Sequence, residues 1–321
     1  LPGAPSTTPT GVLVRAEPDL AVIAGAATTE PLAKWRLSAL MLAPGVPLTH
    51  PEPHWVVLKA RRENEARQKA VQDGDAEPTV RPGTISKKRF LVEIIGDIEL
   101  FARARPELAP HKVVGITGTN GKSTTTALVH HILKTAGVPS AMGGNIGEPI
   151  LSLDPLPEGG VYVLELSSYQ IDLTQSLDCD VAVLLNITPD HLDRYESFEA
   201  YAASKARLFE MQSGEHVWVV TEDENANRLV HDKLPEPAQD RAVTATSTNE
   251  HGSAWMRDGI AIGRQGRVGY QRNWPALAGP HNAQNAICAI AVCERLGVGL
   301  RQISEGLRTY PGLPHRMERI R

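Results

Sequence analysis

The residues with the clearest chemical potential occupy positions 117–124, where the chain reads TGTNGKST. A β-branched run at 113–117 leads into this stretch, and an apolar-periodic segment predicted as a helix over 121–136 follows it. A glycine-rich turn between a strand and a helix presents N–H groups and the positive end of the helix dipole to an anion. Gly118 and Gly121 allow the tight backbone angles of such a turn. We therefore predict a phosphate site here.

The lysine and hydroxyl residues that follow the turn make a nucleoside triphosphate the expected anion. Lys122 suits the β- and γ-phosphates, and Ser123 can offer its hydroxyl to Mg²⁺. The loop is a variant, because the common pattern has a glycine six residues before the lysine and Ile116 stands there instead. The predicted nucleotide contacts in this loop are Gly118, Thr119, Asn120, Gly121, Lys122, Ser123 and Thr124.

An acid is predicted at the carboxyl end of a neighbouring strand. The run VYVLELS at 161–167 indicates a buried strand, and Glu165 lies near its end. Ligands bind at the carboxyl edge of open α/β sheets, so this carboxylate could hold Mg²⁺. The alternative is an acid that faces water without a ligand.

Two further polar segments are predicted at or near this edge. NITPDHLDRY (186–195) follows a strand and places Asp190, His191 and Asp193 there. His191 could bind a second cation or orient a carboxylate, although loop histidines are often structural. Lys205 lies within a helix predicted over 198–212, where its spacing alone indicates a solvated side chain.

Near the C-terminal end, GPHNAQNA opens another predicted helix. Asn282 and Asn285 are three residues apart, so they share one face of its first turn and suit an adenine edge or a helix cap. His315 and Arg316 follow this helical region and could contact phosphate.

The elements that must position these residues alternate regularly after position 110. Strands are predicted at 113–117, 161–167, 180–186 and 216–221, with helices between and after them. This order is typical of an α/β fold with a mostly parallel sheet covered on both faces. Residues 241–275, with Asp-Gly and Gln-Gly turns, indicate a small antiparallel annex, and two helices close the region.

The region before position 110 is less regular. We predict a short strand within LAVIAG (20–25), a strand at 39–42, a Pro-Gly turn and a helix, and then a strand and helix in VEIIGDIELFARA (92–104). Residues 62–90 are dense in charge and poor in apolar residues, which indicates a surface insertion that is part helix and part loop.

Composition excludes several classes of protein. The net charge of −4 gives no electrostatic case for nucleic acid or an anionic membrane. No apolar run approaches the ~20 residues that span a bilayer, and the N-terminus is a poor signal peptide. The three cysteines lack metal-binding spacing, which favours buried reduced thiols. The chain does not begin with Met, which suggests a trimmed or fragmentary N-terminus.

Taken in order, the motifs resemble those of the Mur ligase superfamily, and in particular its D-glutamate-adding branch. The segments that carry the resemblance are GTNGKST (118–124), GGNIG (143–147), LELSSYQ (164–170), PDHLDRY (189–195), YAASKARL (201–208), GPHNAQNA (279–286) and GLPHRME (312–318), together with GDIELF (96–101). The resemblance covers about residues 35–321, apart from the insertion.

The resemblance implies an ATP-driven amide ligation in peptidoglycan synthesis, in the bacterial cytoplasm and by a monomer. The carboxylate of UDP-N-acetylmuramoyl-L-alanine would be phosphorylated to an acyl phosphate, which the amine of D-glutamate would attack. Two Mg²⁺ ions are implied, with Ser123, Glu165, His191 and Lys205 as ligands. Lys205 matches a lysine that CO₂ converts to a carbamate in the family.

The resemblance assigns the remaining site residues as well. It implies catalytic roles for Lys122, Asn145, His191 and Lys205, substrate contacts for Pro44, Gly45, Asn145, Ser167 and Gln170, and nucleotide contacts for Asn282, Asn285 and Arg316.

The expected organisation is a partial Rossmann-like N-terminal domain followed by a central P-loop ATPase domain. We expect the UDP-substrate domain over 1–109, the ATP-binding domain over 110–313, and at 314–321 the start of a linker to a third domain that this chain lacks. No G-x-G-x-x-G appears in residues 1–34, which weakens the expectation of a UDP site.

Two alternatives to the D-glutamate-adding ligase stay open at this point. One is a sibling ligase that adds L-alanine, diaminopimelate or lysine, or a folylpolyglutamate ligase. The other is a nucleotide-binding module without ligase activity, which the expected absence of a third domain favours.

Overall fold

The computed structural model describes residues 12–16, 20–23, 37–73, 91–213, 217–221, 223–233, 242–246 and 253–313. The predicted phosphate contacts His315 and Arg316, and the part of the 62–90 insertion after Asp73, lie outside these residues. In the described parts of the chain, no helix is long and apolar enough to cross a membrane.

A nine-stranded sheet forms the centre of the molecule, in the order β13-β12-β11-β10-β9-β8-β5-β7-β6 among the described strands. The strands from β6 to β11 run parallel, and β12 and β13 continue the sheet antiparallel at one edge. The strands are β5 (His111–Thr117), β6 (Ser140–Gly144), β7 (Gly160–Glu165), β8 (Val181–Leu184), β9 (Val217–Thr221), β10 (Ala242–Thr246), β11 (Ala254–Arg257), β12 (Ile260–Gly263) and β13 (Gly266–Tyr270).

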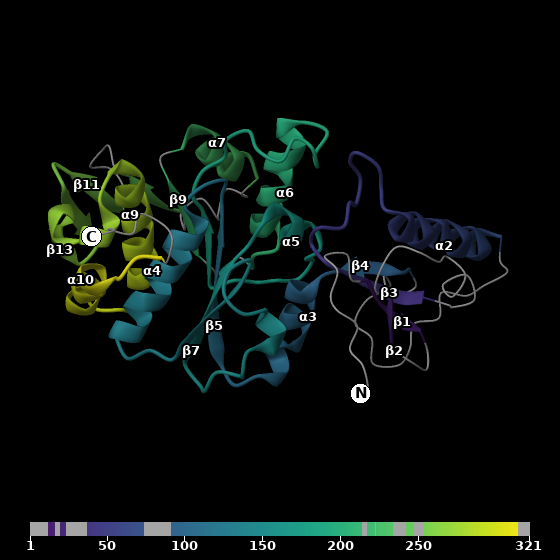
Figure 1. Cartoon of the computed structure of the whole chain (residues 1–321), viewed down its shortest axis with the longest axis horizontal. Coiled ribbons are helices and arrows are strands. Elements are labelled where there is room, and N and C mark those ends of the chain that lie inside the picture. Colours follow the sequence, from purple (N-terminus) through teal and green to yellow (C-terminus); the bar gives the residue numbers. More distant parts are fainter. Residues whose placement is uncertain are drawn as a thin grey trace, which may run out of the picture.

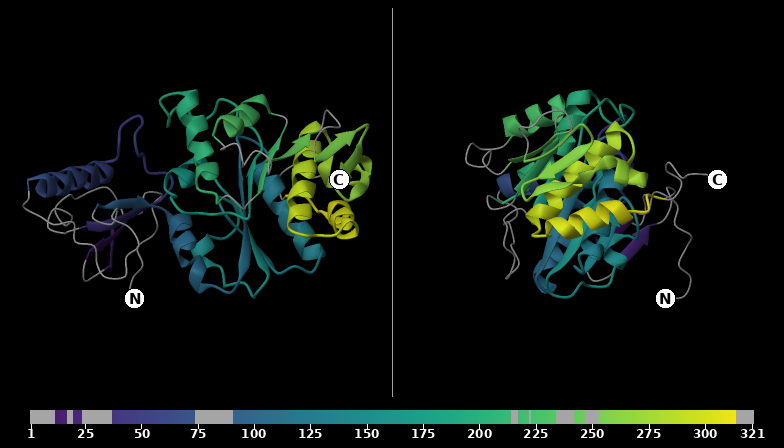
Figure 2. Two further views of the ribbon diagram at one scale, coloured as in Figure 1. Left: turned by 180° about the vertical axis from the view of Figure 1, so that it is seen from behind. Right: turned by 90° about the vertical axis from the view of Figure 1, so that its left-hand side faces the viewer.

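Helices cover both faces of this sheet (Figures 1 and 2). On one face of the sheet, strand side chains form a hydrophobic core with α4, α9 and α10. On the other face, strand side chains form a second core with α3, α5, α6 and α7. Val163 belongs to the first core and its neighbours Tyr162 and Leu164 to the second, because successive side chains of a strand point to opposite faces. The helices are α3 (Asp97–Ala104), α4 (Lys122–Thr135), α5 (Ser168–Asp172), α6 (Phe198–Glu210), α7 (Glu224–Lys233), α9 (Pro280–Arg295) and α10 (Leu300–Thr309).

A smaller sheet, with strand order β2-β1-β3-β4, lies beside the central sheet at the end opposite α10 (Figure 1). It contains β1 (Val12–Ala16), β2 (Leu20–Ile23), β3 (Leu37–Leu42) and β4 (Glu93–Ile95). Helix α2 (Trp55–Gln72) packs on it through Val56, Val57 and Ala60. The predicted helix after the Pro-Gly turn therefore extends into the first eleven residues of the 62–90 segment, as far as Gln72.

A leucine joins the two sheets, and a buried carboxylate holds the loop that carries this leucine. Glu99 on α3 accepts hydrogen bonds from the backbone N–H groups of Gln175 (2.7 Å) and Ser176 (2.9 Å). Leu173, which follows α5, packs into the hydrophobic cluster of the small sheet, and its carbonyl accepts from the N–H of Gly96 at 3.0 Å. The loop after α5 is thus fixed to the segment that enters the central sheet.

Besides β1, which was not predicted, two features differ from the sequence-based expectation. Strand β6 was not predicted, because SAMGG has no β-branched residue and the strand pairs with β7 alone. The predicted small antiparallel annex within 241–275 is confirmed for β11–β13, but it starts later than expected, because β10 pairs parallel with β9 and β11 as a member of the central sheet.

Gly306 provides a test of the packing between α10 and α4. A Cβ there would lie 2.9 Å from the Cα of Ile132, so backbone would have to move. Alanine gains about 1 kcal/mol in helix propensity, but overpacking against backbone costs about 1–3 kcal/mol. We expect Gly306→Ala to lower the free energy of unfolding in urea by about 1 kcal/mol. Arg301→Ala, at an exposed position of the same helix, should change it little; equal stability of the two variants would contradict this packing.

Candidate functional site

The phosphate loop leaves β5 at Thr117 and enters α4 at Lys122. Gly118 has φ +151° and Gly121 has φ +86°, both in the region that favours glycine. A Cβ on Gly121 would lie 2.3 Å from Oδ1 of Asn285, so the loop and α9 approach more closely than any side chain here would allow. Ile116 is buried inside β5, where it pairs with both β7 and β8. The position of the missing glycine is therefore part of the sheet and not of the loop.

Lys122 folds back across the loop. Its Nζ donates to the carbonyls of Gly118 (3.0 Å) and Thr119 (2.9 Å). The ammonium therefore lies directly over the turn where a phosphate would bind, held by acceptors that phosphate oxygens could replace.

Lys205 is a second cation at the same loop, contrary to the solvated position that its helical spacing indicated. It is 1% exposed, and its Nζ donates to the carbonyl of Gly118 at 3.0 Å. The Nζ also lies 4.7 Å from the centre of the Tyr201 ring. Burial, together with the charge of Lys122, lowers the pKa of Lys205 to about 7. A large fraction of this lysine is therefore a neutral, nucleophilic amine at neutral pH.

Glu165 is buried at the end of β7 and retains an unused oxygen. Its Oε1 accepts from Nδ2 of Asn145 at 3.0 Å, and its backbone carbonyl accepts from the N–H of Asn145 at 2.8 Å. Its Oε2 is buried without a hydrogen-bond partner. An orphaned carboxylate oxygen is costly in a protein interior unless a ligand satisfies it. Gly144 permits this close approach, since a Cβ there would lie 2.2 Å from the Glu165 carbonyl.

The phosphate loop, Lys122 and Glu165 line one hollow of about 640 Å³, whereas Lys205 lies behind the loop and is not part of its wall. Its wall is formed by Thr119, Asn120, Gly121, Lys122, Ser123, Met142, Asn145, Ile146, Gly147, Glu165 and Leu313. Cationic and hydroxyl groups from α4 thus face a carboxylate and an amide from β7 and the loop after β6. This arrangement suits a polyphosphate with a bound cation.

His191 lies in the loop after β8 and has φ +54°, which is rare for a residue other than glycine. The centre of its ring lies 5.1 Å from that of Tyr169 and 5.9 Å from that of Tyr201. Its backbone N–H donates to Oδ1 of Asp190 at 2.9 Å. The side chain is 43% exposed. The structure thus places an accessible imidazole beside the ring that Lys205 contacts, while Asp193 is exposed farther along the loop.

Ser167 and Gln170 form a helix cap. Ser167 is the N-cap of α5, its Oγ accepts from the N–H of Gln170, and its own N–H donates to Oε1 of Gln170. This capping box accounts for the recorded hydrogen bonds of both side chains, so their predicted contacts with substrate stay predictions. Pro44 lies at a small crevice next to Tyr169 and Arg194, between the two sheets, while Gly45 follows it in the turn after β3.

The two asparagines of α9 are joined to each other and to the phosphate helix. Nδ2 of Asn285 donates to Oδ1 of Asn282 at 3.3 Å, and Oδ1 of Asn285 accepts from Oγ1 of Thr125 on α4 at 3.3 Å. Asn285 is buried, whereas Asn282 is partly exposed. Asn285 therefore fixes α9 against the phosphate loop, and Asn282 presents a polar edge beside it.

Two loop-holding residues were missed at the sequence level. Asn186 makes three hydrogen bonds to the loop, and Tyr201 OH lies 3.1 Å from Oγ1 of Thr119. In the sequence, the segment around Asn186 drew attention only to Asp190, His191 and Asp193, and the segment around Tyr201 only to Lys205. The strand-end position of Asn186, opposite the loop, was the available signal.

In the described residues, no three His, Cys, Asp or Glu side chains converge on a metal position. The donor set nonetheless fits Mg²⁺: a serine hydroxyl, a buried carboxylate with one unused oxygen, and a hollow wide enough for phosphates and water. Mg²⁺ commonly completes its coordination with substrate phosphates, so a preformed cage is not needed.

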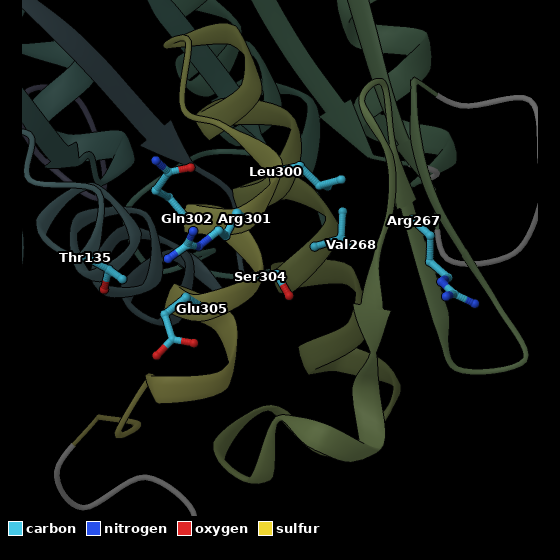
Figure 3. A pocket seen from close by; sticks show the side chains of 8 residues that line it. All are labelled: Thr135, Arg267, Val268, Leu300, Arg301, Gln302, Ser304 and Glu305. Atoms are coloured by element: carbon cyan, nitrogen blue, oxygen red, sulfur yellow. The ribbon is translucent and has the colours of Figure 1, made fainter.

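A second and larger hollow, of about 930 Å³, lies away from these groups between α4, β13 and α10. Figure 3 shows that its polar side chains do not converge: Arg267 extends to one side of β13, while Arg301 and Glu305 project from α10 on the other. Glu305 is paired with Arg308 at 2.6 Å. The chemistry is therefore concentrated at the phosphate loop.

The parallel sheet and the glycine-rich loop between β5 and α4 define this chain as an α/β protein with a P-loop-like central domain. Residues 116–293, more than half of the chain, match the Mur ligase middle domain. The chain belongs to the Mur ligase family.

The similar proteins are ligases of this family. The chain is 56% identical over 229 residues to the UDP-N-acetylmuramoylalanine–D-glutamate ligase of Sphingopyxis alaskensis, covering 71% of this chain and 48% of that protein. It is 45% identical over 294 residues to the enzyme of the same name from Nitrobacter hamburgensis, covering 88% and 56%. The chain thus spans about half the length of the curated relatives it matches.

Solved structures agree on the fold. A UDP-N-acetylmuramoyl-L-alanyl-D-glutamate–2,6-diaminopimelate ligase matches with a TM-score of 0.58 at 23% identity, over 82% of this chain and 61% of that one. MurF from Acinetobacter baumannii matches with a TM-score of 0.53 at 24% identity, over 70% and 51%. The mixed α/β fold with a parallel sheet, predicted from the alternation of elements, is confirmed.

Proposed function

We propose that this chain is the nucleotide- and substrate-binding part of an ATP-dependent ligase that joins D-glutamate to UDP-N-acetylmuramoyl-L-alanine. The observation that carries the proposal is the pair of lysines at Gly118, whose carbonyl accepts from both Lys122 and Lys205 at 3.0 Å. Two cations on one phosphate loop suit a reaction that brings a triphosphate and a carboxylate together. The relatives from Sphingopyxis alaskensis and Nitrobacter hamburgensis, which are 56% and 45% identical to this chain over the aligned residues, are named as this ligase.

The proposed reaction has two steps. A carboxylate oxygen of the muramoyl-linked alanine attacks the γ-phosphorus of ATP, the bond to the β-phosphate oxygen breaks, and ADP leaves. The amine of D-glutamate then attacks the acyl carbon, inorganic phosphate leaves, and the nitrogen loses a proton. Lys122 would exchange its hydrogen bonds to the carbonyls of Gly118 and Thr119 for bonds to the transferred phosphoryl group, because phosphate is the stronger acceptor.

Mg²⁺, when bound, would offset the negative charge of the phosphates, and Ser123 and the free Oε2 of Glu165 would hold it. Asn145 would orient Glu165 through the 3.0 Å hydrogen bond to Oε1. We also propose that the neutral amine of Lys205 adds to CO₂ with loss of one proton, and that the resulting carbamate and His191 serve a second Mg²⁺. The lowered pKa of Lys205 and the short separation of both groups from Tyr201 support this assignment.

We also propose that different regions of the chain bind different ligands. The region 1–109 would bind the UDP substrate, the region 110–313 would bind ATP, and 314–321 would begin a linker to a further domain. The separate small sheet and central sheet support a division in this part of the chain, with α3, before residue 109, packing in the core of the central sheet. We propose that the protein acts as a monomer in the bacterial cytoplasm, which light scattering and fractionation can test.

Calorimetric titration of UDP-N-acetylmuramoyl-L-alanine into this chain, with Mg²⁺ and a non-hydrolysable ATP analogue present, tests the proposal. We expect saturable binding, weakened when Mg²⁺ is removed by chelation. UDP-N-acetylglucosamine, which lacks the lactyl-alanine carboxylate, serves as the control ligand and should bind more weakly. Binding of the analogue without binding of the muramoyl ligand would support a nucleotide-binding module instead and would reject the ligase assignment for this chain.

A further inference from the structure

The segment that follows β8 lies against the phosphate loop and continues the sheet beyond its regular strands. The N–H of Leu185 donates to the carbonyl of Thr117 at 3.0 Å, and the N–H of Thr119 donates to the carbonyl of Asn186 at 2.8 Å. Gly118 allows this approach, since a Cβ there would lie 2.9 Å from Cβ of Leu185 and 3.2 Å from the nitrogen of Asn186.

The side chain of Asn186 extends this pairing by one more residue. Its Oδ1 accepts from the N–H of Asn120 at 2.8 Å, and its Nδ2 donates to the carbonyl of Asn120 at 3.0 Å. A primary amide bound to both groups of one residue imitates a β-sheet partner. We call these contacts, together with the backbone bond to Thr119, the Asn186 clamp.

The clamp has a consequence for the way the loop can hold an anion. The N–H groups of Thr119 and Asn120 both point to Asn186, so they are not available to a phosphate. The first hydrogen bond within the helix runs from the N–H of Thr125 to the carbonyl of Gly121, which leaves the amides of the first turn of α4 without acceptors in the helix. Phosphate recognition therefore falls on this first turn and on Lys122.

The clamp also holds the acceptors that position Lys122 and Lys205. Both lysines donate to the carbonyl of Gly118, and Lys122 donates in addition to that of Thr119. A second contact strengthens the clamp at Thr119, whose Oγ1 accepts from the N–H of Thr188 at 3.1 Å. If the loop moved, the amides, the hydroxyls and both cations would lose their common geometry, which has to be set before the nucleotide binds.

We propose that Asn186 is a positioning residue for the nucleotide: it fixes the phosphate loop in its binding conformation without touching the phosphates itself. This inference rests on the proposed nucleotide site. It assigns Asn186 a role through the loop, distinct from the cation and metal roles given to Lys122, Glu165, His191 and Lys205.

Asn186→Leu keeps the branched shape of the side chain and removes both side-chain hydrogen bonds, and Asn186→Ala is a second variant in case the leucine disturbs packing. The matched control is Asn225→Leu, because Nδ2 of Asn225 donates to the neighbouring carbonyl of Ile187 at 3.1 Å but Asn225 makes no recorded contact with the loop. Circular dichroism establishes that each variant is folded.

Two readouts distinguish positioning from general structural support. The first is the affinity for a non-hydrolysable ATP analogue and for inorganic tripolyphosphate, each with Mg²⁺. We expect both Asn186 variants to bind both probes at least about tenfold more weakly, by a similar factor because the loss lies in the phosphate subsite. Asn225→Leu should bind within about twofold of the parent chain. The second readout is hydrogen exchange of the Asn120 amide, which should become faster in the Asn186 variants and stay unchanged in the control.

The inference is overturned if folded Asn186 variants bind both probes within twofold of the parent chain, or if the Asn120 amide keeps its protection. A parent chain that binds neither probe would reject the proposed nucleotide site instead. In that case the exchange of the Asn120 amide still decides whether Asn186 holds the loop.

Discussion

Replacing Lys205 by methionine should make this chain more stable and at the same time remove a group on which its proposed chemistry depends. The lysine is buried, with a carbonyl and an aromatic ring as neighbours. Methionine fills a similar volume without a charge to desolvate. We expect the free energy of unfolding to rise by about 1–3 kcal/mol at pH 6, measured by urea denaturation.

The gain should depend on pH in a defined direction. The pKa of Lys205 is lowered from 10.5 to about 7 in the folded chain, so between these values the unfolded chain holds the proton more firmly. The stability of the parent chain should therefore rise with pH from about 7 upward, while below pH 7 the cost of the buried ammonium is fully present. The advantage of Lys205→Met should be largest at pH 6 and should shrink by about 2–3 kcal/mol toward pH 9.

Bicarbonate supplies the control for this prediction. If Lys205 accepts CO₂, adding bicarbonate to degassed buffer should change the thermal midpoint of the parent chain and leave that of Lys205→Met unchanged. Arg207→Met, on the same helix, should show no such difference from the parent chain. A Lys205→Met variant that is less stable than the parent chain at every pH would contradict the view that burial of the charged lysine destabilises the folded chain.

Lys122→Ala should abolish binding of Mg²⁺-ATP while the chain stays folded. Lys122 covers the loop through two carbonyl contacts and is only partly buried, so its loss should change stability by less than about 1 kcal/mol. The positive charge is the main partner for the β- and γ-phosphates, so we expect affinity for a non-hydrolysable analogue to fall at least about 100-fold.

Lys134→Ala is the matched control, because this lysine lies exposed at the other end of α4. It should bind the analogue as the parent chain does. Normal binding of Mg²⁺-nucleotide by Lys122→Ala would show that the phosphate loop has been assigned wrongly.

Local sequence was sufficient to find the phosphate loop and the strands beside it. The glycines, the lysine and the flanking periodicities all concern residues that are close together in the chain, and β5, β7 and β8 are continuous apolar runs because helices cover both faces of the sheet. Glu165 was also found at its strand end, and the unsatisfied oxygen explains why an acid there differs from one that faces water.

Lys205 could not be placed from its helix alone. The spacing of α6 indicates that Tyr201 and Lys205 share a face, but the burial of Lys205 depends on the phosphate loop, whose Gly118 carbonyl accepts from its Nζ. Only the resemblance to a family assigned it a role. The role of Asn186 was not predicted for a similar reason. Its partners, Thr119 and Asn120, lie at least 66 residues away in the sequence, and the residues around Asn186 do not indicate them.

Ser167 shows the opposite case, a residue whose local signal was available and was not used. The spacing of Ser167 and Gln170 is that of a capping box, S-x-x-Q, which the structure contains in full. A motif that a resemblance assigns to substrate can also be needed to begin a helix.

The position of Leu173 means that a domain border drawn by residue number cuts through a single hydrophobic cluster. This leucine belongs in sequence to the nucleotide-binding region, yet it fills the cluster formed by Leu40, Val46 and Val57. A protease that cut the chain near Pro110 would therefore leave two pieces held together by that cluster and by the Glu99 contacts. Residues 1–109 expressed alone would lack Leu173 and leave part of this cluster uncovered.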